Sequence, residues 1–131
     1  MSLTRAFLSF DFDHDEASRN LFKGQMATES PTPFSAADWS SKESLPQAQW
    51  EAIIEAKIKQ CDVMIVLVGA HMSTARGVEK EISFAKRNKI PVFGVYLKGC
   101  GELTTLPNGL NRADVVEWKW NEIARKLRAV I

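Results

Sequence analysis

A run of six apolar residues, Val63–Val68, constrains the fold of this chain more than any other segment. A strand with one exposed face would alternate apolar and polar residues, and this run contains no polar residue. Both of its faces must therefore be covered, which is typical of a central strand in a parallel sheet. The run predicts an α/β protein whose middle strand spans about 62–68.

Apolar segments on either side of this run alternate between strand-like and helix-like patterns. Strands are expected at 5–11, 33–37, 62–68, 91–97 and 113–117, and helices at 13–24, 49–61, 77–88 and 118–131. Such alternation is typical of a parallel sheet covered by helices on both faces, a three-layer sandwich. For five strands the common order is the flavodoxin-like 2-1-3-4-5. Its crevice, between strands 1 and 3, would be lined by residues 9–13 and 69–77.

The composition is that of one soluble domain, residues 1–131, with 45% hydrophobic and 25% charged residues. A formal net charge of +1 argues against nucleic acid and against a membrane surface as partners. No stretch is apolar and long enough to span a bilayer, and the N-terminus lacks the layout of a signal peptide. Cys61 and Cys100 fit no metal or redox spacing. These features predict a cytoplasmic protein.

Glu81 is the first candidate for chemistry. On a helical wheel Val78, Ile82 and Ala85 share the face that should pack on the sheet, and Glu81 lies at its margin. This helix follows the central strand, so the carboxylate would lie near the crevice where open α/β sheets bind ligands. The alternative is an ordinary surface carboxylate in an i, i+4 ion pair.

Two relatives of this fold are disfavoured by the residues at the crevice. A response-regulator receiver needs an aspartate at the end of strand 3, where this chain has Val68, Gly69 and Ala70. A flavodoxin needs hydroxyl and glycine residues after strand 1, whereas the acidic segment 11–15 would repel a phosphate. Asp13 has the spacing of a helix cap, and no metal site is predicted because adjacent residues rarely converge on one ion.

Five segments, in this order along the chain, resemble the TIR-like domain family. They are Phe-Leu-Ser-Phe-Asp at 7–11, the strand 3 region at 58–69, the glutamate segment at 73–82, the following strand at 90–95, and Trp-Lys-Trp-Asn at 118–121. The resemblance covers nearly the whole chain and is closest to the short, single-domain bacterial TIR-like proteins of the Thoeris anti-phage type. One departure is that family members usually carry a tryptophan shortly before the glutamate, in the region where this chain has Gly77 and Val78.

The resemblance implies an enzyme that cleaves the nicotinamide–ribose bond of NAD with Glu81 as the catalytic residue. NAD would be a substrate rather than a cofactor, and the product a cyclic ADP-ribose-type messenger that activates a separate effector protein. Self-association is also implied. The expected substrate-binding residues are Phe10, Asp11, Asp38, Ser40, His71 and Ser73.

Three of these residues also have a purely structural interpretation. Phe10 could belong to the core, Asp11 could end the first strand, and His71 could be an ordinary loop histidine. Asp38 and Ser40 fall in the loop after strand 2, which commonly gates the pocket in TIR assemblies. Two alternative functions stay open, a non-enzymatic TIR-type interaction module and a domain that only senses a nucleotide.

Overall fold

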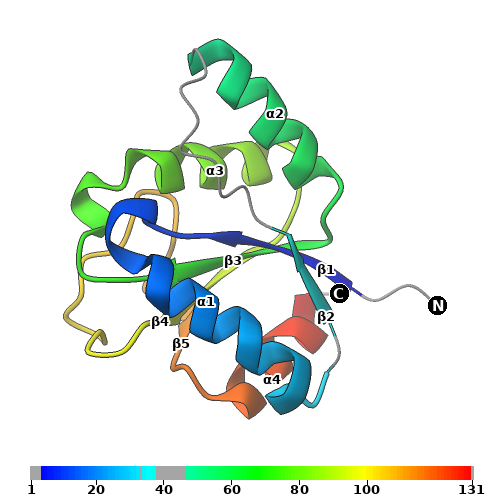
Figure 1. Cartoon of the computed structure of the whole chain (residues 1–131), viewed down its shortest axis with the longest axis vertical. Coiled ribbons are helices and arrows are strands. Elements are labelled where there is room, and N and C mark those ends of the chain that lie inside the picture. Colours follow the sequence, from blue (N-terminus) through cyan, green and yellow to red (C-terminus); the bar gives the residue numbers. More distant parts are fainter. Residues whose placement is uncertain (1–3, 33, 38–46, 131) are drawn as a thin grey trace.

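The computed structural model describes residues 4–32, 34–37 and 47–130, in which strands and helices alternate (Figure 1). The elements are β1 (Thr4–Ser9), α1 (Phe12–Glu29), β2 (Phe34–Ala37), α2 (Gln47–Lys59), β3 (Val63–Val68), the 3₁₀ turn η1 (Met72–Thr74), α3 (Arg76–Arg87), β4 (Val92–Tyr96), the 3₁₀ turn η2 (Arg112–Asp114), β5 (Val115–Val116) and α4 (Trp120–Val130). The five strands form one sheet in the order β2-β1-β3-β4-β5, and every neighbouring pair is parallel. The predicted fold class and strand order are confirmed.

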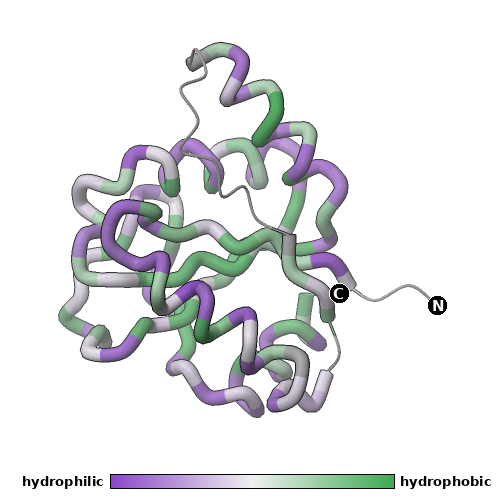
Figure 2. The backbone as a smooth tube through the Cα atoms, viewed as in Figure 1, coloured by the Kyte–Doolittle hydropathy of each residue, from purple (hydrophilic) through white to green (hydrophobic). Residues whose placement is uncertain are grey.

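The central position of β3 follows from its apolar sequence. Ile65 is in register with Leu8 of β1 on one side and with Phe93 of β4 on the other. All six residues of β3 are fully buried. Burial of such a side chain stabilises a fold by about 1.5–3 kcal/mol. The apolar strands accordingly run through the middle of the molecule in Figure 2.

Two hydrophobic cores lie on opposite faces of the sheet, because successive residues of a strand point to opposite sides. Met64, Val66 and Val68 pack with the helix residues on the α2 and α3 side. Ile65 and Leu67 pack with those on the α1 and α4 side. Figure 1 shows these two helix pairs on either side of the sheet. The arrangement is the predicted three-layer sandwich.

The first helix begins earlier than the sequence predicted. Asp11 is its N-cap, and the carboxylate Oδ1 of Asp11 accepts a hydrogen bond from the backbone N–H of Asp13 at 3.2 Å. The prediction that Asp13 is the cap is wrong, because β1 ends at Ser9 and leaves Asp11 with the extended backbone that a cap requires. The helix also continues through Gly24 as far as Glu29.

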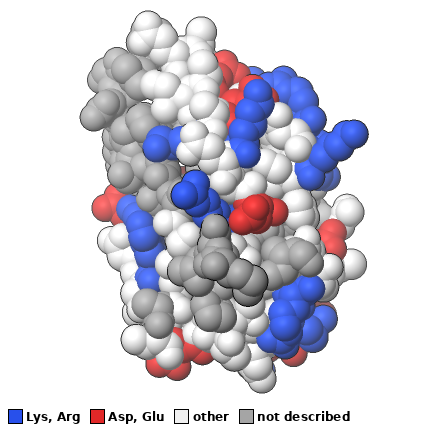
Figure 3. Space-filling view, turned by 90° about the vertical axis from the view of Figure 1, so that its right-hand side faces the viewer, with Lys and Arg blue, Asp and Glu red and all other residues white. Residues whose placement is uncertain are grey.

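Charges of both signs are distributed over the surface. On the face drawn in Figure 3, Lys and Arg side chains lie in several separate groups with Asp and Glu among them. That pattern agrees with the formal net charge of +1, and the exclusion of nucleic acid as a partner stays a prediction. Among the helices of the described residues, none has both the length and the apolar character needed to cross a membrane.

Candidate functional site

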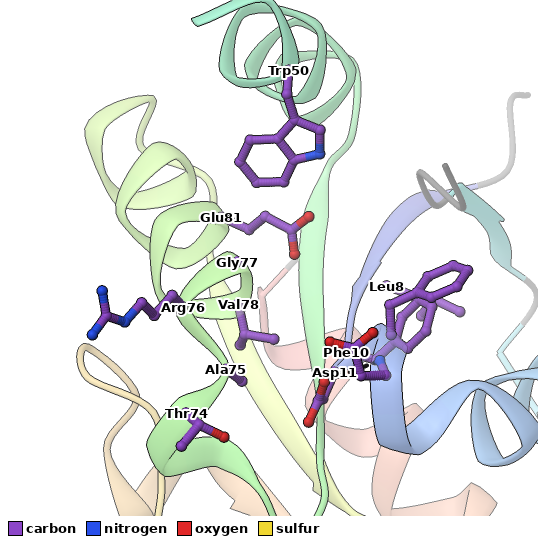
Figure 4. A pocket seen from close by; sticks show the side chains of 12 residues that line it. Leu8, Phe10, Asp11, Trp50, Thr74, Ala75, Arg76, Gly77, Val78 and Glu81 are labelled. Atoms are coloured by element: carbon purple, nitrogen blue, oxygen red, sulfur yellow. Dashed lines mark hydrogen bonds between the residues drawn. The ribbon is translucent and has the colours of Figure 1, made fainter. Parts of the chain in front are cut away.

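A cavity of about 310 Å³ lies at the carboxyl ends of β1 and β3, where α1, α2 and α3 approach the sheet (Figure 4). It is lined by Leu8, Phe10, Asp11, Phe12, Asp13, Trp50, Thr74, Ala75, Arg76, Gly77, Val78 and Glu81. The carboxyl ends of parallel strands all lie at the same edge of the sheet. In this strand order the connections that follow β1 and β3 go in opposite directions, which leaves a crevice between them. The cavity therefore lies at the crevice predicted from the strand pattern.

Glu81 lies in this cavity rather than on the open surface. Its side chain is 9% exposed, and its neighbours on α3, Val78 and Ile82, are buried against the sheet. The hydroxyl of Ser9, at the end of β1, donates a hydrogen bond of 2.7 Å to Oε1 of Glu81. Figure 4 shows the carboxylate directed from α3 toward the wall formed by Leu8 and Phe10. The helix and the strand thus hold one carboxylate in a fixed position inside the cavity.

Phe10 and Asp11 form the wall that faces Glu81. Phe10 is 9% exposed and belongs to the core as well as to the cavity wall. Its ring packs on Phe12 with centroids 5.7 Å apart, and the guanidinium of Arg19 lies 5.0 Å from its centroid. Asp11 is also buried and is held by its capping hydrogen bond. Both expected residues therefore line the cavity.

The cavity has a second aromatic wall that the sequence did not assign to the site. Trp50 of α2 is half-buried, and its indole lies above Glu81 in Figure 4. A Cβ atom at Gly77 would lie 4.0 Å from Cη2 of Trp50, an ordinary contact distance, so the indole lies directly over the start of α3. The three- and four-residue spacing of apolar residues in this helix predicts only that Trp50 lies on its buried face. The aromatic surface near the glutamate segment thus comes from another helix.

Arg76, Thr74 and Ala75 also line the cavity without having been predicted to do so. They belong to the end of η1 and the start of α3, so their place depends on the turn between β3 and that helix. The Arg76 side chain is exposed and extends away from Glu81 in Figure 4. The only signal for these residues was their position inside the predicted crevice segment 69–77.

Two expected residues after β3 lie outside the cavity wall. His71 and Ser73 are exposed and are not among the lining residues. His71 instead stacks on His14, with ring centroids 3.7 Å apart and an interplanar angle of 15°. Asp38 and Ser40, the expected residues of the loop after strand 2, lie outside the described residues.

The carboxylate of Asp15 lies next to the stacked histidines, in a position where its ionisation is disfavoured. Burial raises the pKa of Asp15, and the nearby Asp11 carboxylate raises it further, while His71 and His14 oppose the shift. The side chain lies against Gly69, where a Cβ atom would overlap the carboxylate. Backbone angles at Asp15 (φ −117°, ψ 15°) depart from helical values, which kinks α1 after its first turn.

The parallel sheet, its strand order and the buried carboxylate at its crevice define a flavodoxin-like α/β domain of the TIR-like class. The chain belongs to the family described as Thoeris protein ThsB, TIR-like domain, whose family profile matches residues 7–101. The matched region runs from β1 past β4 and includes every residue that lines the cavity. No curated protein matches this sequence. Membership of a Thoeris family indicates a signalling role in anti-phage defence.

Proposed function

We propose that this domain is an enzyme that cleaves the nicotinamide–ribose bond of NAD and forms a cyclic ADP-ribose-type messenger. The observation that carries the proposal is the position of Glu81, a carboxylate inside a cavity and hydrogen-bonded by Ser9. A carboxylate held in a partly enclosed site can stabilise positive charge that develops on a bound substrate.

Cleavage of this bond needs such stabilisation. The bond between C1′ of the ribose and the pyridinium nitrogen breaks, its electron pair leaves with neutral nicotinamide, and positive charge develops on the ribose. A carboxylate beside the sugar stabilises the oxocarbenium-like transition state, as in other glycosyl transfers. Attack by water at C1′ gives ADP-ribose, whereas attack by an adenine nitrogen or a hydroxyl of the same molecule gives a cyclic isomer. In this proposal Glu81 provides the carboxylate and Ser9 orients it.

The walls of the cavity suit the nicotinamide half of the dinucleotide. Phe10 and Trp50 offer aromatic faces on which a flat ring can stack, on either side of the Glu81 carboxylate. The volume of about 310 Å³ is at the lower end of the range for small-molecule sites, about 300–1,000 Å³. Asp11 would order the loop after β1, and Asp38 and Ser40 stay predicted contacts.

The proposal also includes a messenger and a separate protein that responds to it. A product that diffuses away from the cavity would activate a separate effector protein, in line with membership of a Thoeris family. Self-association of the domain belongs to the same proposal, since TIR-like domains commonly act as assemblies. Turnover would then depend on an infection trigger or on a high protein concentration.

The test is release of nicotinamide from NAD by the wild type and by Glu81→Gln, at high protein concentration and in lysate from infected cells. Glu79→Gln is the matched control, because Glu79 lies on the same helix but binds the backbone N–H of Asn108 outside the cavity. Loss of a charge-stabilising group should lower turnover by about 10²- to 10³-fold in Glu81→Gln. The control should keep wild-type turnover.

Three results would contradict the proposal. Equal, non-zero turnover by the wild type and Glu81→Gln would remove Glu81 from its role. An equal loss in Glu79→Gln would show that any charge change on α3 disturbs the fold. No turnover by the wild type under either condition would favour the alternative, a non-enzymatic interaction module.

A further inference from the structure

The two histidines of the chain meet outside the cavity, although they are far apart in the sequence. His14 lies in the first turn of α1, and His71 lies in the turn that precedes α3; Figure 1 shows these two segments side by side. The imidazole rings are stacked with centroids 3.7 Å apart. Nδ1 of His14 also lies 2.7 Å from Oδ2 of Asp11. Two imidazoles and a carboxylate thus share one place at the carboxyl edge of the sheet.

The spacing of these groups is close to that of a metal site. One ligand atom each from Asp11, His14 and His71 can be chosen so that all three lie within 4.8 Å of one another. Ligand atoms bound at about 2.0–2.2 Å lie at most about 4 Å apart, so only a small closure is needed. Two stacked rings cannot point at the same ion, but His71 is exposed and its ring can turn toward the Asp11–His14 pair.

A second observation points to a ligand beside this cluster. Oδ2 of Asp15 is buried and has no hydrogen-bond partner. An orphaned carboxylate oxygen is costly in a folded protein, and such groups often mark the position of an ion or a water molecule. Gly69 lets the Asp15 carboxylate lie against the end of β3, beside the turn that carries His71. The cluster of Asp11, His14 and His71 offers two nitrogen ligands and one oxygen ligand, and the Asp15 carboxylate lies beside it.

We propose that Asp11, His14 and His71 bind a divalent transition metal ion of the Zn²⁺ class, with the Asp15 carboxylate beside them. Imidazole nitrogens favour Zn²⁺ and similar ions, whereas Mg²⁺ and Ca²⁺ prefer ligand sets made of oxygen alone. A divalent ion would neutralise the charges of the Asp11 and Asp15 carboxylates and so remove the repulsion between them. The spacing of neighbouring residues had predicted no metal, because the ligands come from two separate turns.

The ion would connect the turn after β1 with the turn after β3, across the crevice of the sheet. Asp11 belongs both to this cluster and to the wall of the Glu81 cavity. The bound ion would therefore hold one wall of that cavity in place. Metal binding needs no NAD, so it can be tested independently of the proposed reaction.

The experiment is a Zn²⁺ titration of the tag-free full chain after removal of metal with a chelator, followed by calorimetry and by NMR of the imidazole signals. Because the chain has only two histidines, both sets of imidazole signals should shift on addition of one equivalent of Zn²⁺. His71→Ala and Asp11→Asn should each weaken binding by at least about 10- to 100-fold. Mg²⁺ at the same concentration should not compete.

Two control variants test whether Zn²⁺ binds at this cluster rather than at other side chains. Glu16→Gln removes an exposed charge from the same end of α1, and Cys100→Ser removes the more exposed of the two thiols. Both variants should bind Zn²⁺ like the wild type. The proposal is overturned if the wild type shows no binding, if only one imidazole shifts, if His71→Ala retains wild-type affinity, or if Cys100→Ser loses it. If the wild type shows no binding, the histidines form only a stacked pair held by Asp11.

Discussion

Removal of the Ser9 hydroxyl tests whether β1 holds Glu81 in place. Ser9 is fully buried and Glu81 is 9% exposed, so little water can replace the 2.7 Å hydrogen bond in Ser9→Ala. A hydrogen bond to a charged group contributes about 1.5–3 kcal/mol, and loss of this bond should lower the free energy of unfolding by that amount. If the bond also orients the carboxylate for catalysis, the same energy corresponds to about a 13- to 160-fold loss in kcat/KM.

A double-mutant cycle isolates the contribution of this contact. Urea denaturation would give the free energy of unfolding of the wild type, Ser9→Ala, Glu81→Gln and the double variant. Because a neutral amide is a weaker acceptor, Ser9→Ala should cost only about 0.5–1.5 kcal/mol in the Glu81→Gln background. Ser83→Ala is the control, since the Ser83 side chain is exposed and its hydroxyl donates a hydrogen bond to the carbonyl of Lys80 within the same helix; its effect should stay within about 0.5 kcal/mol. The same cost for Ser9→Ala in both backgrounds would refute the reasoning.

Three further predictions follow from other contacts. The Arg87 guanidinium lowers the pKa of Glu55. This pair therefore stabilises the fold at pH values above the ordinary carboxyl pKa of about 4.3, and the stabilisation is lost as the pH falls through the lowered pKa of Glu55. The difference in Tm between the wild type and Glu55→Gln should therefore shrink on acidification, and a constant difference would contradict the ion pair. Burial raises the pKa of the Cys61 thiol, so iodoacetamide at neutral pH should modify Cys100 first, as mass spectrometry would show; equal rates would count against the buried position. Trp50→Leu should raise the KM for NAD by about 2- to 13-fold, because aromatic stacking contributes about 0.5–1.5 kcal/mol, and an unchanged KM would remove Trp50 from the site.

Much of the candidate site could not be predicted from local sequence patterns. The spacing of Val78, Ile82 and Glu81 places the carboxylate at the margin of a buried face, but no pattern identifies Ser9 as its hydrogen-bond partner. Trp50 has the signature of a core residue and lies over the cavity only because α2 packs beside α3. Periodicity describes one element at a time, whereas these contacts join elements that the fold brings together.

Sequence patterns are enough to predict the order of strands and helices, the central place of Val63–Val68 and the face that α3 buries, because the spacing of apolar residues within one element sets which of its sides is buried. Tertiary structure alone decided that Asp11 rather than Asp13 caps α1 and that His14 meets His71. The first depends on where β1 ends, and the second on where β1 and β3 end relative to each other. The packing of the whole sheet sets these strand ends, and no segment of the chain encodes them separately.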